Sequence, residues 1–297
     1  MQLSLFQKVF HLLKFSFDTV TVNRRGEIIK LERKQARYFT EYLRNNITLD
    51  MVYIPGGKFM MGSPEGEGLD TEKPQHEVTV PAFFMGKYQV TQEQWKAVAA
   101  LPKVDRKLNP DPSYFKGNNL PVEQVSWYDA EEFCKRLSQH TDRQYSLPSE
   151  AEWEYACRTG TTTPFHFGET ITSELANYNA GYAFADENEG EYRKKTTLVG
   201  QFNKANAFGL YDIHGNVWEL CLDDWHNDYK VAPNGYIAWI NKNKQGNTVL
   251  RGGSWDNNPK RCRSASRAIN DRKGRVYYIN YVGFRVVCVC GVGRALP

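Results

Sequence analysis

The sequence predicts an α+β fold that is rich in loops, and three observations lead to this prediction. From Met51 onward, glycine, tryptophan, tyrosine and asparagine are frequent, and they separate short apolar runs of strand length. Two segments in the same part combine helical periodicity with helix-start signals. The composition, with 41% apolar and 24% charged residues over 297 positions, is that of a globular chain long enough for a large core.

Two helices are expected in this part of the chain. Ser126 is followed by an apolar-periodic run that ends near Leu137, and its hydroxyl suits the N-cap position. Ser149 is followed by Glu150 and Glu152, and carboxylates in a first helical turn are favoured by the helix dipole. Both segments are therefore predicted to be helices that begin at a serine cap.

Residues 1–50 are expected to form an N-terminal extension, and residues 51–290 the main domain. The change in composition at Met51 sets this boundary. Apolar residues at three-to-four spacing predict an amphipathic helix from Gln2 to Phe15. Its apolar stripe needs a partner elsewhere in the chain.

The rest of the extension contains a hairpin signal. The runs 19–22 and 27–31 flank a turn in which Gly26 can adopt a positive φ, so these runs are predicted to be paired strands. A second helix is expected over residues 33–43.

The positive charge of the chain is concentrated near its C-terminal end. The net charge is only +4, but ten Lys or Arg residues lie from Arg251 onward, against Asp256 and Asp271. Such a segment could attract acidic ligands or nucleic acid. The alternative is that the arginines are solvated or stacked between loops, and this alternative is preferred.

The cysteines and histidines give no sign of a zinc or haem site. The six cysteines contain no CxxC pair and share no metal-ligand spacing with the six histidines. Polar residues interrupt the first 17 residues, which lack the features of a signal peptide or a membrane span. We therefore expect a cytoplasmic protein without a membrane partner, whose thiols are mostly free.

Seven motifs occur in an order that is characteristic of one family. They are Met51-Val52-Tyr53-Ile54-Pro55-Gly56-Gly57-Lys58-Phe59, Val90-Thr91-Gln92 with Trp95, Leu147-Pro148-Ser149-Glu150-Ala151-Glu152-Trp153-Glu154-Tyr155, Asn206-Ala207-Phe208-Gly209-Leu210-Tyr211-Asp212, Gly215-Asn216-Val217-Trp218-Glu219, Arg251-Gly252-Gly253-Ser254-Trp255 and Gly283-Phe284-Arg285. In this order they resemble the formylglycine-generating enzyme, or sulfatase-modifying factor, family. The resemblance implies a C-type-lectin-like fold with a small antiparallel sheet, two helices and long loops.

The same resemblance bears on catalysis. Formylglycine-generating enzymes bind copper through two cysteines that follow the Gly-Gly-Ser-aromatic motif, because copper(I) prefers soft thiolates. In this chain Asn257 fills the first position, and Cys262 is the one cysteine that follows closely. We therefore predict a non-catalytic protein. The alternative is a copper-dependent formylglycine-generating oxidase that acts on a protein cysteine.

A second resemblance concerns residues 251–288. This stretch resembles the variable region of proteins diversified by retroelements, which keep the framework and change selected positions between. Tyrosine, asparagine, aspartate and serine are common there, and such mixtures are typical of binding loops. The resemblance implies ligand contacts from Asp256, Asn257, Asn258, Lys260, Ser266, Ala268, Ile269, Asn270, Asp271, Gly274, Val276, Tyr277, Tyr278, Ile279, Asn280 and Tyr281.

Tyr277, Tyr278 and Tyr281 are the expected anchors of this surface. Together with Asn257, Asn258, Ile269 and Asn270, they should lie side by side on one exposed face. The alternative is that these tyrosines pack into the core. The expected partner is a protein that the sequence does not name. A nucleic-acid partner is ranked last, because it depends only on the basic tail.

The family resemblance also implies structural calcium. One site would take carboxylates from Asp212 and Glu219 and carbonyls from Gly215 and Val217, an oxygen set that suits this hard cation. The alternative is a loop held by ordinary carboxylate hydrogen bonds. A second site would comprise Asn177, the Tyr178 carbonyl and Glu191, and this site is less secure because glutamate replaces the usual aspartate.

Overall fold

The protein is described from a computed structural model, which covers residues 11–233, 235–241, 246–270 and 279–289. A six-stranded antiparallel sheet has the order β1-β2-β3-β6-β12-β7, a four-stranded sheet has the order β10-β9-β8-β11, and β4 pairs with β5. The strands are β1 (Leu13–Val22), β2 (Ile28–Tyr42), β3 (Thr48–Ile54), β4 (Gly57–Met61), β5 (His76–Val80), β6 (Phe83–Gly86), β7 (Tyr145–Ser146), β8 (Trp218–Asp224), β9 (Thr248–Arg251), β10 (Arg267–Asn270), β11 (Val282–Gly283) and β12 (Val287–Val289). The helices are α2 (Gln92–Ala99), α3 (Trp127–Thr141) and α4 (Glu150–Arg158), with 3-10 helices η1 (Arg44–Asn46), η2 (Asp70–Glu72) and η3 (Pro259–Cys262).

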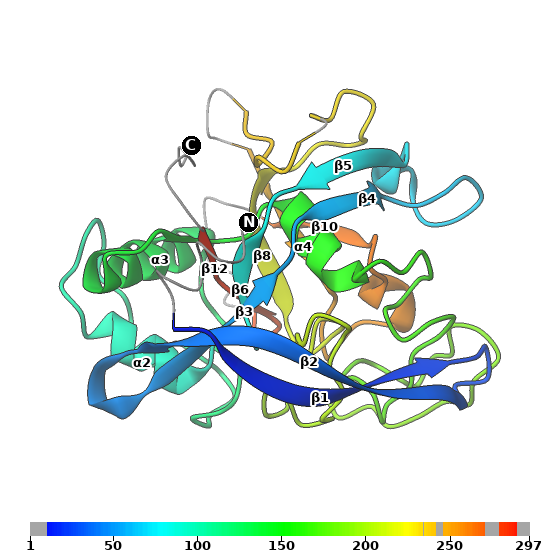
Figure 1. The fold of residues 1–297 in the computed structure, drawn as a ribbon, viewed down its shortest axis with the longest axis horizontal. Coiled ribbons are helices and arrows are strands. Elements are labelled where there is room, and N and C mark those ends of the chain that lie inside the picture. Colours follow the sequence, from blue (N-terminus) through cyan, green and yellow to red (C-terminus); the bar gives the residue numbers. More distant parts are fainter. Residues whose placement is uncertain (1–10, 234, 242–245, 271–278, 290–297) are drawn as a thin grey trace.

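The six-stranded sheet separates two cores. Phe84 of β6 and Cys288 of β12 belong to the cluster formed with α2 and α3, whereas Met85 and Val287 belong to the cluster that contains Trp153 of α4. Successive side chains of a strand point to opposite faces, so α2 and α3 cover one face and α4 the other. Figure 1 shows α2 and α3 together on one side of the molecule, with α4 near its centre. This arrangement confirms the α+β, C-type-lectin-like fold.

The two predicted helices are confirmed, and each begins at the expected serine. The hydroxyls of Ser126 and Ser149 accept the backbone N–H of Asp129 and Glu152, whose carboxylates accept the serine N–H in return. The structure adds a third helix, α2, which the prediction missed. Its signal is the same capping box, formed by Thr91 and Gln94.

The hairpin in the N-terminal extension is confirmed and is longer than predicted. β1 pairs with β2 from Leu13↔Tyr38 to Val22↔Ile28, and Gly26 has a φ of 76° in the turn. This hairpin runs along one edge of the molecule (Figure 1). Because β2 also pairs with β3, the extension and the following segment share one sheet.

Two helix predictions in the extension were wrong where the structure describes the chain. Residues 13–15 of the helix expected over Gln2 to Phe15 belong to β1, and residues 1–10 lie outside the described residues. Residues 33–42 of the second expected helix belong to β2. The period-2 alternation of β2 was hidden because one of its inward-facing residues is charged. Glu41 is buried, and it is stabilised by Arg143 and by the hydroxyl of Tyr145.

No helix among the described residues is long and apolar enough to cross a membrane. The four tryptophans of the family motifs, Trp95, Trp153, Trp218 and Trp255, are all buried. The described cysteines, Cys134, Cys157, Cys221, Cys262 and Cys288, are buried free thiols.

Candidate ligand-binding site

The arginines of the C-terminal framework are buried structural residues. Arg251 and Arg267 bind the carboxylates of α4, with Arg251 contacting Glu154 and Arg267 forming two hydrogen bonds of 2.5 and 2.9 Å to Glu150. Arg285 binds Glu219 through bonds of 2.6 and 2.8 Å. Their charges are therefore matched inside the fold. The preferred interpretation of the basic tail, in which arginines pack within the fold, holds for these three.

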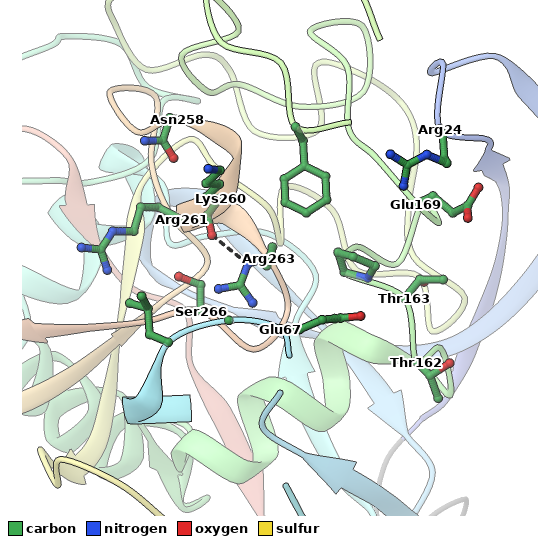
Figure 2. Close-up of a pocket in the computed structure, with 14 residues that line it drawn as sticks. Arg24, Glu67, Thr162, Thr163, Glu169, Asn258, Lys260, Arg261, Arg263 and Ser266 are labelled. Atoms are coloured by element: carbon green, nitrogen blue, oxygen red, sulfur yellow. Dashed lines mark hydrogen bonds between the residues drawn. The ribbon is translucent and has the colours of Figure 1, made fainter. Parts of the chain in front are cut away.

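Residues between Arg251 and Arg267 line a cavity at the surface. The cavity has a volume of about 840 Å3, which is within the usual range of about 300–1,000 Å3 for ligand pockets. Figure 2 shows Asn258, Lys260 and Arg261 on one side of it, with Arg24, Thr163 and Glu169 on the other. The lining residues are Arg24, Glu67, Gly68, Leu69, Thr162, Thr163, Pro164, Glu169, Phe184, Asn258, Lys260, Arg261, Arg263 and Ser266.

The cavity carries charges of both signs. Lys260 and Arg261 are exposed on η3, and neither forms an ion pair with any residue that the structure describes. Arg263, in contrast, is held by two bonds of 2.9 and 2.7 Å to Glu72. Glu67 and Glu169 supply exposed carboxylates. Such a cavity can take a ligand that has both positive and negative groups.

Among the predicted ligand-binding residues at positions 256–260, some line the cavity and others do not. Asn258 and Lys260 are exposed and line the cavity. Asp256 is exposed as well, but its carboxylate accepts a hydrogen bond of 2.5 Å from the Tyr192 hydroxyl, outside the cavity lining. Asn257 is half-buried, and its Oδ1 accepts the hydroxyl proton of Ser254 at 2.7 Å.

The remaining predicted contacts differ in exposure. Ile269 is 52% exposed on β10, and Asn270 and Asn280 are half-buried. Ser266 is fully buried, so it does not belong to an exposed face, although it contributes to the cavity wall. Of the residues expected on one exposed face, Asn258 and Ile269 are exposed, whereas Asn257, Asn270 and Tyr281 are half-buried. Ala268, Ile279 and Tyr281 are half-buried and pack against the core with α2 and α3.

Five of the predicted contacts lie outside the described residues, and they include two of the expected tyrosine anchors. They are Asp271, Gly274, Val276, Tyr277 and Tyr278. Tyr281, the third anchor, is partly a core residue, because it packs against the core with α2 and α3 and its carbonyl accepts the Trp218 N–H at 2.8 Å. This burial raises the pKa of its hydroxyl.

Most of the cavity was not predicted from the sequence, because only Asn258, Lys260 and Ser266 of its lining residues were among the expected contacts. Thr162, Thr163 and Glu169 come from the loop after α4, and Arg24 comes from the turn of the β1–β2 hairpin. No motif marks these residues, because only the packing of the hairpin against the loop brings them to η3. One indirect signal is the glycine at position 26, which fixes the turn that carries Arg24.

Cys262 has no partner thiol in the described part of the chain. Its side chain is fully buried, its Sγ lies 3.9 Å from the Asn258 carbonyl, and no disulfide forms. Burial raises the pKa of the thiol to about 12, so it is protonated at neutral pH. Copper is bound by thiolates, and a protonated, enclosed thiol is a poor ligand.

Oxygen atoms of the residues predicted for the first calcium site do converge, but the side chain of Gln89 lies at their centre. The carbonyl oxygens of Asp212, Gly215 and Val217 and the Oε1 of Glu219 all lie 3.1–3.2 Å from Nε2 of Gln89. The carboxylate of Asp212 takes a different direction and accepts the Gly200 N–H at 2.6 Å. This set does not fit an additional calcium ion in the described arrangement, because Gln89 occupies its centre.

The second calcium set serves separate partners. Asn177 is buried and donates to the carbonyl of Lys195 and to Asn216 Oδ1. Glu191 is exposed and forms an ion pair of 2.9 Å with Arg193. The Tyr178 carbonyl accepts the N–H of Ala180 at 3.0 Å. The second site stays a prediction.

Comparisons with known proteins agree with this fold. The mouse (Mus musculus) formylglycine-generating enzyme is 30% identical over 67% of this chain and 66% of its own length. The bovine (Bos taurus) inactive C-alpha-formylglycine-generating enzyme 2 is 26% identical over 85% of this chain and 91% of its own length. The structure of Treponema denticola variable protein 1 has a TM-score of 0.68 and 25% identity, and the match covers 85% of this chain and 99% of that one.

Several relatives are longer proteins than this one. The match spans 38% of the Chlamydia caviae protein named serine/threonine-protein kinase pkn1, which is 31% identical over 84% of this chain. The family described as the sulfatase-modifying factor enzyme 1-like domain matches residues 38–289. This range includes every strand of the three sheets except β1 and the first part of β2. The chain therefore belongs to the sulfatase-modifying factor enzyme 1-like family.

Proposed function

We propose that this chain is a non-catalytic binding protein that holds a polypeptide ligand in the cavity beside η3. The observation that carries the proposal is the state of Cys262, which is buried, protonated at neutral pH and not bonded to any other described cysteine. A copper-dependent oxidation of a protein cysteine needs a pair of accessible thiolates. One relative is named as a formylglycine-generating enzyme and another as an inactive one, so membership of the family does not by itself decide between the two functions.

The chemistry of the cavity supports a polypeptide ligand. Lys260 and Arg261 offer exposed positive charge, Glu67 and Glu169 offer negative charge, and Phe184 and Pro164 offer apolar contact area. A polypeptide carries all three kinds of group. For a nucleic acid or another polyanion, the two carboxylates would offset the attraction of Lys260 and Arg261.

The catalytic alternative is tested directly. We expect no oxygen consumption and no formylglycine formation when the protein is incubated with copper and a Cys-x-Pro-x-Arg peptide. The mouse formylglycine-generating enzyme serves as the positive control. Turnover by this chain that depends on Cys262, and is lost in Cys262→Ser, would establish the oxidase instead.

The binding site is tested with a random peptide library displayed on phage. We expect peptides selected on the wild-type protein to lose binding to the double variant Lys260→Glu, Arg261→Glu. The matched control is Lys103→Glu, Lys107→Glu, which makes the same change in charge at exposed lysines between α2 and α3. Selected peptides that bind the cavity variant as well as they bind the control would place the ligand elsewhere.

We also propose that residues 251–288 are a region diversified by a retroelement. The exposed positions Asp256, Asn258, Lys260 and Ile269 alternate with buried framework residues, as such a region requires. The similarity to Treponema denticola variable protein 1 supports this proposal. The neighbouring DNA tests it, because we expect a reverse transcriptase gene and a near-copy of this coding segment that differs at adenines. A locus without either would contradict the proposal.

A further inference from the structure

Gln89 joins two parts of the domain from a fully buried position. It lies between β6 and α2, and its neighbour Val90 exchanges backbone hydrogen bonds with Phe284 and Val122. Its side chain is 1% exposed and reaches the loop of residues 212–219. The backbone on either side of Gln89 is therefore fixed by the fold, and this fixes the position from which the side-chain amide reaches the loop.

The nitrogen of this amide faces four oxygen atoms at nearly equal distances. Three are the backbone carbonyls of Asp212, Gly215 and Val217, at 3.2, 3.2 and 3.1 Å, and the fourth is Glu219 Oε1 at 3.1 Å. An amide nitrogen carries two hydrogens, so each is shared between two acceptors in three-centre bonds. The opposite amide orientation would place Oε1 against four oxygens with no hydrogen between them.

The charge of Glu219 is already balanced without a metal ion, and the buried carboxylate of Asp212 lies near enough to interact with this pair. Both carboxylate oxygens of Glu219 are bound by Arg285, and Trp153 Nε1 donates to one of them at 2.7 Å. A divalent cation at the centre of the cluster would add two positive charges beside a neutral pair. Unmatched charge in a buried site is strongly unfavourable.

We propose that the amide of Gln89 takes, in this chain, the place that the family resemblance assigns to calcium. The amide hydrogens draw the three carbonyls and Glu219 together, so the loop of residues 212–219 keeps its turns without a bound ion. The amide supplies the electropositive hydrogens that the oxygens need, and Arg285 balances the charge of Glu219.

The wild-type protein provides the first test. We expect the same melting temperature in EDTA and in excess calcium chloride, within about 1 °C, because a ligand stabilises only a protein that binds it. The same comparison and an isothermal titration with calcium are made with Glu191→Gln, which removes the carboxylate of the second predicted site, and this variant should show no binding. A rise in its melting temperature of about 3 °C or more with calcium, or an equal loss in EDTA, would overturn the proposal and restore the calcium site.

The second test is Gln89→Glu, which has nearly the same shape but replaces the two donor hydrogens with an acceptor. In EDTA we expect the melting temperature to fall by about 10 °C, because five oxygens then meet without a hydrogen or cation. Calcium should restore part of this loss, since the added carboxylate completes an oxygen site for the ion. Failure of calcium to restore any stability would refute the idea that the amide occupies a cation position.

The matched control is Gln94→Glu. Gln94 is also buried, but its Nε2 donates to the single carbonyl of Thr48 at 2.8 Å, and a glutamate keeps the capping bond from Thr91. We expect a smaller loss that calcium does not change. Equal losses in the two variants would contradict a special role for Gln89. If Gln89→Glu does not fold in EDTA, the calcium response of Glu191→Gln still decides the question.

Discussion

Strand β9 and the 3-10 helix η3 are separated by only seven residues, yet their basic residues serve different purposes. Arg251 ends β9 with an exposed fraction of 0%, and its guanidinium contacts Glu154 and the carbonyls of Ser264 and Ala265. Arg261 on η3 is exposed and lines the cavity. A segment that looks uniformly basic in the sequence thus divides into a framework of buried arginines paired with carboxylates and a surface of exposed basic side chains.

The difference indicates how this domain could tolerate change in its binding region. The buried arginines bind α4, so the framework is held by residues far away in the sequence, and the η3 surface contributes little to it. Substitutions at the exposed positions of η3 should then change which ligand is bound without changing the fold. The following predictions test this separation of stability from binding.

The largest effect is expected for Arg251→Met. The substitution leaves Glu154, which is fully buried, with Arg158 as its remaining guanidinium partner. Breaking a buried ion pair by removing one member costs about 3–5 kcal/mol of unfolding free energy. Urea unfolding monitored by tryptophan fluorescence measures the loss. Arg261→Met is the control, and a comparable loss there would contradict the division between framework and surface.

A pH-dependent effect is expected from a carboxylate that lies near this network. Burial, together with the charge of Glu150, raises the pKa of Asp223 from 3.8 to about 7. Because the folded-state pKa is above the unfolded value, the folded state binds the proton more tightly. The stabilisation is present below about pH 4 and is lost as the pH rises to about 7, at up to about 1.4 kcal/mol per pH unit.

Asp223→Asn should remove this contribution. We expect the difference in unfolding free energy between the wild type and the variant to change across the same pH range, measured by urea unfolding at several pH values. Asp111→Asn, at an exposed position, controls for a general effect of charge. A difference that is constant from pH 4 to 7 would show that Asp223 does not titrate in this range.

An intermediate effect is expected for Tyr281→Ala. Tyr281 packs against the core with α2 and α3 but is only half-buried. The loss should be about 1–3 kcal/mol, below the cost of about 3–5 kcal/mol for a fully buried aromatic residue. Thermal unfolding compares it with Tyr182→Ala, at a position that is 60% exposed. A loss of unfolding free energy no larger than that of the control would indicate that Tyr281 belongs to the ligand-binding surface rather than to the core.

The smallest effect on stability is expected for the pair Asn258→Ala and Lys260→Ala. Both residues are exposed on the cavity wall, so each substitution should shift the unfolding free energy by no more than about 0.5 kcal/mol. Binding of the selected peptides should nevertheless weaken. A large loss of stability with unchanged peptide binding would show that these two residues stabilise the fold and do not bind the ligand.

Features that depend on a few neighbouring residues were predicted from the sequence. Ser126 and Ser149 cap their helices as expected, because a capping box requires only residues three positions apart. The turn at Gly26 is similar, since its positive φ is a local property. The ordered motifs were also sufficient for the family, which the match over residues 38–289 confirms.

Features that depend on distant partners could be decided only by the tertiary structure. The inward position of Glu41 is stabilised by Arg143 and Tyr145, which follow about 100 residues later, so the strand character of β2 was not visible locally. The η3 cavity likewise needs the hairpin turn that carries Arg24.

The cluster around Gln89 shows the same distinction most clearly. The sequence indicated that oxygens of residues 212–219 would converge, because those residues form one motif. It could not indicate what lies at their centre, since Gln89 precedes them by more than 120 residues and reaches them only through the fold. Local sequence determines caps, turns and motif geometry, because their energies arise between neighbours. Burial and charge matching are decided by tertiary structure, because their energies depend on which distant residues exclude water together.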